Sequence, residues 1–135
     1  GHTVGLKQGA RQYLSALKTF GVKLGVATSL PRELYMPALL NLDIFDCFDV
    51  ICSTDQVSHG KTRPDIFYLT ADKLDTPPAQ CIVFEDILQA IQSAKGAGMT
   101  VYGMYDQSSA GHWEEIKGIA DGILYDFKDA PLPSK

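Results

Sequence analysis

The chain has 135 residues, of which 45% are hydrophobic, and its 16 acidic and 12 basic residues leave a formal net charge of −4. This length and composition are typical of one compact domain, and the scattered Lys and Arg residues argue against binding to nucleic acid or to an anionic membrane. No apolar run approaches the roughly 18 residues of a membrane span, so we expect a cytoplasmic protein.

Within this chain we expect a core domain over residues 3–130 and a short tail over residues 131–135. The first two residues, Gly-His, are interpreted as a possible remnant of an expression tag. Cys47, Cys52 and Cys81 are odd in number and lack the paired close spacings of a zinc site, so we expect buried free thiols.

The first part of the chain alternates helical and extended patterns. Apolar side chains recur at helical spacing over residues 10–20, and Gly21 is a suitable stop. Residues 22–27 form a short apolar run typical of a buried parallel strand. Pro31 can begin a helix towards residue 40, which Pro37 should kink or divide because it removes a backbone donor.

The same alternation continues to the end of the chain. Strands are expected at 50–52, 81–84, 100–105 and 122–124, and helices at 64–74, 87–95 and, weakly, 113–117. Strands separated by helices imply right-handed crossovers and a mostly parallel sheet. The predicted class is therefore α/β, a Rossmann-like, doubly wound parallel sheet with helices on both faces.

In such sheets ligands bind beyond the carboxyl ends of the strands. The sequence places Thr28 and Ser29 after one strand, Lys61 in a loop after the next, and Glu85 and Asp86 after a third. A transferring phosphoryl group needs hydrogen-bond donors, a cation and usually Mg²⁺ held by carboxylates, so this combination suits a phosphate ester. Each residue also has a purely structural interpretation, because hydroxyls and carboxylates cap helices and loop lysines are commonly solvated.

Four segments then form a recognisable pattern: residues 24–29 (LGVATS), 60–67 (GKTRPDIF), 83–86 (VFED) and 94–99 (AKGAGM). In order and spacing they resemble the second, third and fourth motifs of the haloacid-dehalogenase superfamily. More narrowly, they are similar to its β-phosphoglucomutase and sugar-phosphate phosphatase branch. The likeness extends over nearly the whole chain, from Gly9 to about Leu124.

The resemblance implies a role for each candidate residue. Thr28 and Ser29 would bind the phosphoryl group, Lys61 would neutralise it and steady the nucleophile, and Asp86 with Glu85 would hold Mg²⁺. Three residues depart from the family pattern at these motifs: Thr62, Ile87 and Ala90 stand where the family has Pro, a small residue and Gly. A bulky Ile87 beside the metal carboxylate is expected to crowd the site.

The family's first motif is a strand ending in Asp-x-Asp, whose first Asp attacks phosphorus and forms an aspartyl-phosphate. No such motif occurs in this sequence. Asp43 and Asp46 follow a predicted helix instead of a strand, and Asp126 and Asp129 have the wrong spacing.

By the resemblance, the chain begins about where the family's cap domain returns to the core, so we expect a fragment without the first strand. That strand would lie between the strands that end at Thr28 and Phe84, and its absence would leave two unpaired edges. We therefore expect no phosphatase turnover from this chain alone. We expect the fold to be completed by a complementing chain segment or a homo-oligomer, or by the two half-sheets closing directly on each other.

The function that the resemblance implies is Mg²⁺-dependent hydrolysis of a phosphate monoester in a small phosphorylated metabolite. Phosphomutase chemistry is a close variant, and a non-catalytic module that binds phosphorylated ligands or mediates oligomerisation is an alternative. A phospho-receiver domain is disfavoured because it presents its acidic residues first, whereas here the hydroxyl and lysine precede the carboxylates.

Overall fold

The computed structural model describes residues 9–57 and 64–133. The helices are α1 (Ala10–Thr19), α2 (Arg32–Asn41), α3 (Asp65–Lys73), α4 (Leu88–Gly96) and α5 (Trp113–Ile119). The strands are β1 (Gly25–Thr28), β2 (Val50–Ser53), β3 (Ile82–Glu85), β4 (Thr100–Met104) and β5 (Gly122–Leu124). Short 3₁₀ turns join several of these elements.

The predicted order of helices and strands is confirmed, with boundaries that shift by up to three residues. One expectation on α2 was only partly right, because Pro37 does not divide this helix. The proline lies in the second helical turn and faces solvent, so it removes a single backbone bond while the turns on both sides remain helical.

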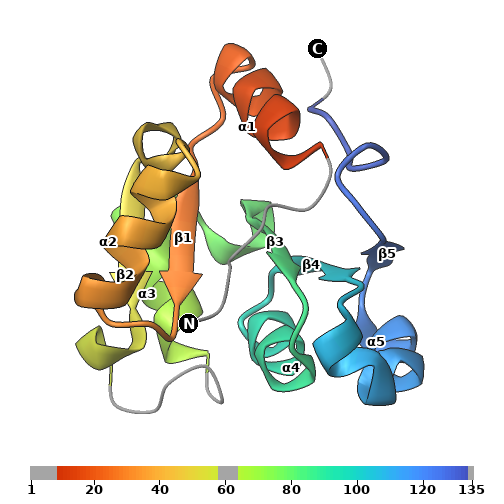
Figure 1. Ribbon diagram of the computed structural model, residues 1–135. Coiled ribbons are helices and arrows are strands. Elements are labelled where there is room, and N and C mark those ends of the chain that lie inside the picture. The colour runs from red at the N-terminus through yellow and green to blue at the C-terminus, as the bar shows by residue number, and fades with distance from the viewer. Residues whose placement is uncertain (1–8, 58–63, 134–135) are drawn as a thin grey trace.

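All strand pairs are parallel, but the strands form two sheets instead of one. β1 pairs with β2, and the second sheet has the order β3-β4-β5. Figure 1 shows β1 and β3 as the inner strands, with β2 and β5 on the outside. Among the described residues, pairing is therefore interrupted between β1 and β3, which is the place expected for the absent strand.

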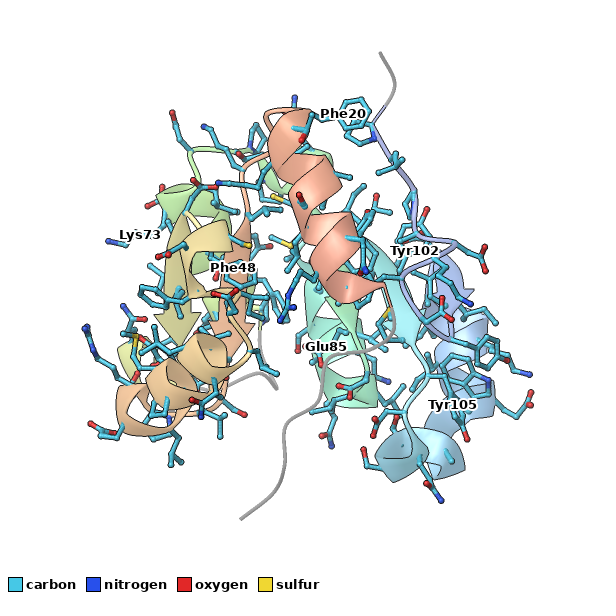
Figure 2. The ribbon with its side chains drawn as sticks, turned by 45° about the horizontal axis from the view of Figure 1, so that its top comes forward. Phe20, Phe48, Lys73, Glu85, Tyr102 and Tyr105 are labelled. Carbon is cyan, nitrogen blue, oxygen red and sulfur yellow. The ribbon has the colours of Figure 1, made fainter. Side chains whose placement is uncertain are left out.

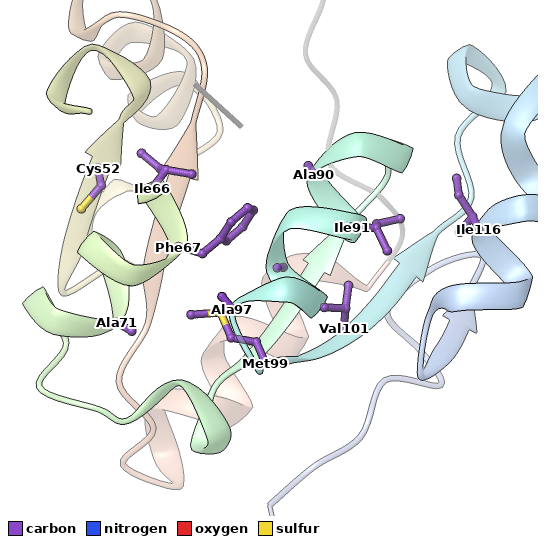
Figure 3. Close-up of a cluster of buried hydrophobic side chains, with 11 residues drawn as sticks. Cys52, Ile66, Phe67, Ala71, Ala90, Ile91, Ala97, Met99, Val101 and Ile116 are labelled. Carbon is purple, nitrogen blue, oxygen red and sulfur yellow. The ribbon is translucent and has the colours of Figure 1, made fainter. Parts of the chain in front are cut away.

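Helices cover the two faces of these sheets and connect them. On one face, Phe67 of α3 packs in the same buried cluster as Ala90 and Ile91 of α4. Figure 3 shows Phe67 pointing from α3 towards α4. On the other face, Tyr13 of α1 lies edge-to-face against Phe84 of β3, with ring centroids 5.6 Å apart. The doubly wound class is thus confirmed even though the sheet is split.

Two aspartates secure the connections that precede outer strands. Asp49 accepts a hydrogen bond from the Leu24 amide at 2.7 Å, which lowers the pKa of its carboxyl. Asp121 accepts from Lys95 Nζ at 2.8 Å and from the Val101 amide at 2.7 Å. These bonds, chiefly that from Lys95, lower the pKa of Asp121. Both carboxylates thus join the start of one strand to the neighbouring strand.

Two further expectations from the sequence concern membrane-spanning segments and the cysteine thiols. Within residues 9–57 and 64–133, every helix is too short or too polar to cross a membrane. All three cysteines are free; Cys52 is buried, whereas Cys47 and Cys81 are only partly buried. The tail is tied to the first helix, because Tyr13 Oη donates to the Pro131 carbonyl at 2.5 Å.

Candidate active site

The carboxyl ends of the inner strands, β1 and β3, lie on the same side of the molecule. β1 ends at Thr28, next to Ser53 at the end of β2, and β3 ends at Glu85. In Figure 1 both β1 and β3 run towards the lower part of the view, and Figure 2 shows Glu85 at that end of β3. The hydroxyl and carboxylate candidates therefore share one side, although they belong to separate sheets.

Thr28 is half-buried, and its side chain is hydrogen-bonded to the loop that follows it. Its Oγ1 accepts a hydrogen bond from the Leu30 amide at 3.1 Å, so the hydroxyl helps to shape the turn that leads into α2. Pro31 occupies the cap position of α2, and no side chain caps this helix end. The interpretation of Thr28 as a simple cap of α2 is therefore wrong. Ser29 is exposed in the same turn.

Glu85 and Asp86 form the acidic part of the site. Glu85 is only 9% exposed, and its Oε1 accepts hydrogen bonds from the amides of Asp86 (3.1 Å) and Ile87 (3.3 Å). These bonds hold a carboxyl oxygen at the turn between β3 and α4. The neighbouring Asp86 carboxyl is half-buried against it.

This crowding changes the acidity of Asp86. Burial, followed by the hydrogen bond and the charge of Glu85 and the charge of Asp106, raises the pKa of Asp86 to about 6. Ionising the pair thus costs free energy in the absence of a cation. A partly buried carboxyl with a strongly raised pKa at the carboxyl end of a parallel sheet is typical of a functional site.

The chemistry of these donors fits a hard divalent cation. Two adjacent carboxylates offer oxygen ligands only, as Mg²⁺ prefers, and a cation between them would relieve the repulsion that raises the Asp86 pKa. Within the described parts of the chain, however, no group of three or more His, Cys, Asp or Glu side chains converges at metal-binding distance. Glu85 and Asp86 alone would therefore supply only some of the oxygen ligands that such a cation needs.

Comparison with known proteins assigns the family. A model of haloacid dehalogenase-like hydrolases matches residues 2–98 of the chain. The chain belongs to the haloacid dehalogenase-like hydrolases. It is 37% identical over 97 residues to a phosphorylated carbohydrates phosphatase of Thermotoga maritima, an alignment that covers 71% of this chain and 45% of the relative.

Solved structures in this family share the fold. The CbbY protein of Rhodobacter sphaeroides, crystallised with xylulose 1,5-bisphosphate, has a TM-score of 0.80 at 30% identity, covering 95% of this chain and 57% of that one. A β-phosphoglucomutase of Clostridium difficile has a TM-score of 0.81 at 24% identity, covering 93% of this chain and 52% of that one. The chain thus spans about half the length of the relatives that it matches.

Asp106 is a residue near the Glu85–Asp86 pair to which sequence reasoning assigned no role. It follows β4, accepts a hydrogen bond from the Ser108 amide at 3.0 Å, and its charge contributes to the raised pKa of Asp86. The signal was present in the sequence, because Asp106 stands just after a predicted strand. Only the tertiary structure shows that its charge reaches Asp86.

Two of the family's candidate positions, Lys61 and Thr62, lie outside the described residues. Ile87 directs its side chain largely to solvent, with 47% of the residue exposed, so the expected crowding of the carboxylates is not observed. Ala90 is completely buried within the cluster between α3 and α4, where its methyl group is accommodated. Asp46 lies in a 3₁₀ turn (Phe45–Cys47), which supports the view that it is no strand-end nucleophile.

Proposed function

We propose that this chain supplies the phosphate-binding and metal-binding half of an Mg²⁺-dependent phosphatase that hydrolyses a phosphate monoester of a small phosphorylated metabolite. The observation that carries the proposal is the crowded Glu85–Asp86 pair, which lies at the same side of the molecule as Thr28. The names of the relatives, a phosphorylated carbohydrates phosphatase and a protein crystallised with a sugar bisphosphate, favour a sugar phosphate as substrate.

In this proposal each candidate residue has a distinct role. Asp86 and Glu85 hold Mg²⁺, which neutralises charge on the phosphoryl oxygens when bound. The Thr28 hydroxyl and the backbone amide of Ser29 donate hydrogen bonds to the phosphoryl group, and the Lys61 ammonium balances its charge. The attacking carboxylate is supplied by a complementing chain segment, because the Asp-x-Asp motif of the family does not occur in this sequence.

Phosphate release provides the test. The chain alone, with 5 to 10 mM Mg²⁺ as a roughly saturating concentration, is expected to release no phosphate from p-nitrophenyl phosphate or from a panel of sugar phosphates. The chain joined to a segment that supplies the carboxylate is expected to turn over, and EDTA or Asp86→Asn should abolish that turnover. Asp72→Asn, which removes an exposed carboxylate of α3, is the matched control.

Two results would contradict this function. Turnover by the isolated chain that is lost in Asp86→Asn would show that the nucleophile lies within it. Turnover of the joined protein that survives both EDTA and Asp86→Asn would remove the role of the acidic pair.

A further inference from the structure

Three aromatic side chains are in mutual contact at the carboxyl ends of β4 and β5. Tyr105 directly follows β4, Tyr125 directly follows β5, and Trp113 is the first residue of α5. The ring centroids of Tyr105 and Trp113 are 5.2 Å apart. Tyr125 lies 5.5 Å from Tyr105 and 5.7 Å from Trp113 by the same measure. We call these three residues the aromatic trio.

The backbone and the core hold the aromatic trio in place. The Tyr105 amide donates to the Leu124 carbonyl at 2.8 Å, so the residues that follow β4 and β5 stay side by side. Trp113 packs against the buried cluster that contains Ile116 of the same helix. Tyr125, in contrast, is 62% exposed. The aromatic trio is therefore anchored in the core at Trp113 and presents the Tyr125 ring to solvent.

The polar atoms of the aromatic trio are available to a ligand. Among the residues that the structure describes, no hydrogen bond is formed by the phenol oxygens of Tyr105 and Tyr125 or by Trp113 Nε1. Every buried side-chain nitrogen or oxygen in this part of the chain has a partner, so these three atoms reach the surface. Aromatic ring faces with free polar groups at their edges are typical of sites for ligands that combine C–H groups with hydroxyls.

The angles between the rings favour a sugar ring over a flat base. The ring planes of Tyr105 and Trp113 meet at 81°, and Tyr125 is inclined by 61° to Trp113 and by 41° to Tyr105. A nucleobase is held best in a slot between two parallel rings, and none of these pairs forms one. The C–H groups of a pyranose carry slight positive charge, so they can rest on the negative face of one ring while the sugar hydroxyls bond to the polar edges of the others.

The aromatic trio lies on the same side of the molecule as the Glu85–Asp86 pair. Glu85 is the register partner of Gly103, which precedes Tyr105 by two residues. Asp106, the residue after Tyr105, contributes charge that raises the pKa of Asp86. Figure 2 shows Glu85 and Tyr105 towards the same end of the second sheet. Two strand spacings, or about 10 Å, separate β3 from β5, so a group esterified to a phosphate at the acidic pair can extend to the trio.

We propose that the aromatic trio binds the sugar ring of a phosphorylated carbohydrate whose phosphate lies between Thr28 and the Glu85–Asp86 pair. The C–H face of the sugar rests on the exposed ring of Tyr125, and its hydroxyls bond to Trp113 Nε1 and to the phenol oxygen of Tyr105. The trio thus selects phosphate esters that carry a ring over those with a short open chain. The position of the phosphate rests on the proposed function, whereas the ring site rests on the aromatic trio alone.

An NMR titration of the full chain with Mg²⁺ present distinguishes the two parts of this site. Trp113 is the only tryptophan in the sequence, so its indole N–H gives a single signal that reports the ring site. The backbone amides of Ser29 and Asp86 report the phosphate. Glucose 6-phosphate should shift all three signals, and glycerol 3-phosphate, which has no ring, should shift only the two amides. Half-saturation should need an at least about fivefold lower concentration of glucose 6-phosphate.

Substitutions of Tyr125 test the ring site directly. Tyr125→Ala should weaken the binding of glucose 6-phosphate by at least about fivefold and leave that of glycerol 3-phosphate unchanged. Tyr125→Phe keeps the ring face and should retain most of the affinity. Because Tyr125 is largely exposed, the Ala variant should fold, with a melting temperature lowered by no more than about 4 °C. Tyr68→Ala on α3, where the tyrosine is 46% exposed, is the matched control and should alter neither affinity.

The outcomes separate the ring site from the phosphate site. A Trp113 signal that glucose 6-phosphate leaves unmoved, or equal affinities of Tyr125→Ala and the unsubstituted chain, would overturn the proposal. So would tighter binding of adenosine 5′-monophosphate at Trp113, since the rings would then prefer a base. A shift at Trp113 without any shift at Ser29 and Asp86 would support the ring site and count against the proposed function.

Discussion

Replacing Asp86 with Asn should stabilise the metal-free chain at neutral pH and leave its stability at low pH nearly unchanged. The pKa of Asp86 is raised to about 6 by burial, Glu85 and Asp106, against an ordinary value of 3.8. Below pH 3.8 the carboxyl is protonated in both the folded and the unfolded chain. Between pH 3.8 and 6 the unfolded chain loses this proton first, so the free energy of unfolding falls as the pH rises.

A shift of this size corresponds to at most about 3 kcal/mol, and the half-exposed position of the carboxyl and its screening by water reduce the expected effect to about 1 kcal/mol. For a chain of this length, that free energy corresponds to about 4 °C in melting temperature. Asp86→Asn should therefore melt about 4 °C higher than the unsubstituted chain at pH 7.5 in EDTA, and within about 1 °C of it at pH 3.5.

Circular dichroism melts of Asp86→Asn and the unsubstituted chain at both pH values would measure this difference, with Asp72→Asn as the charge-matched control. An equal rise in melting temperature for Asp86→Asn and Asp72→Asn would indicate that the net charge of the chain, and not local repulsion at Asp86, causes the effect. A loss of stability in Asp86→Asn at pH 7.5 would refute the reasoning outright. With Mg²⁺ present the unsubstituted chain should have the higher melting temperature, because only this chain gains free energy from binding the cation.

Two further substitutions, one of them with a matched control variant, test the packing and the charges of the second sheet. Gly103→Ala should destabilise the chain by about 1 to 3 kcal/mol in urea unfolding, because the added Cβ would lie 2.6 Å from Ile116 Cγ2. Gly118→Ala on α5, where the added Cβ meets nothing within 4 Å, should be neutral or stabilising. An equal loss of stability in Gly103→Ala and Gly118→Ala would contradict this account. Asp121→Asn should cost up to about 1 kcal/mol at pH 7, since it breaks a partly exposed ion pair with Lys95. Because the pKa of Asp121 is lowered in the folded chain, its contribution to stability is lost as the pH falls below the ordinary value of 3.8. The unfolding free energies of Asp121→Asn and of the unsubstituted chain should therefore become equal in acid. A difference between them that stays constant with pH would count against the ion pair.

Local patterns in the chain were sufficient to locate its elements. The apolar runs that contain Val26 and Phe84 are too short for helices and end in polar residues, which is typical of buried parallel strands. Pro37 was judged by its local effect alone, but the cost of one missing bond on an exposed helix face does not outweigh the bonds of the turns around it. Boundary shifts of one to three residues reflect the weak local preference of strand ends.

The candidate site was predictable to the extent that its residues directly follow strands. Glu85 and Asp86 are adjacent in the sequence, so their meeting required no knowledge of the fold. The influence of Asp106 and the exposure of Ile87 were not predictable, because both depend on how the turns after β3 and β4 lie in space. Thr28 was correctly placed at the end of β1, whereas its partner, the Leu30 amide, was found only in the structure.

By itself, then, the sequence determined the α/β class, the order of the elements and the identity of the acidic pair, because periodicity and spacing are local properties. The family resemblance also placed a gap between the strands that end at Thr28 and Phe84, and the sheet is divided there, between β1 and β3. Tertiary structure alone decided that the raised pKa of Asp86 arises from burial among other carboxylates. Strand pairing and electrostatic crowding depend on residues far apart in the chain.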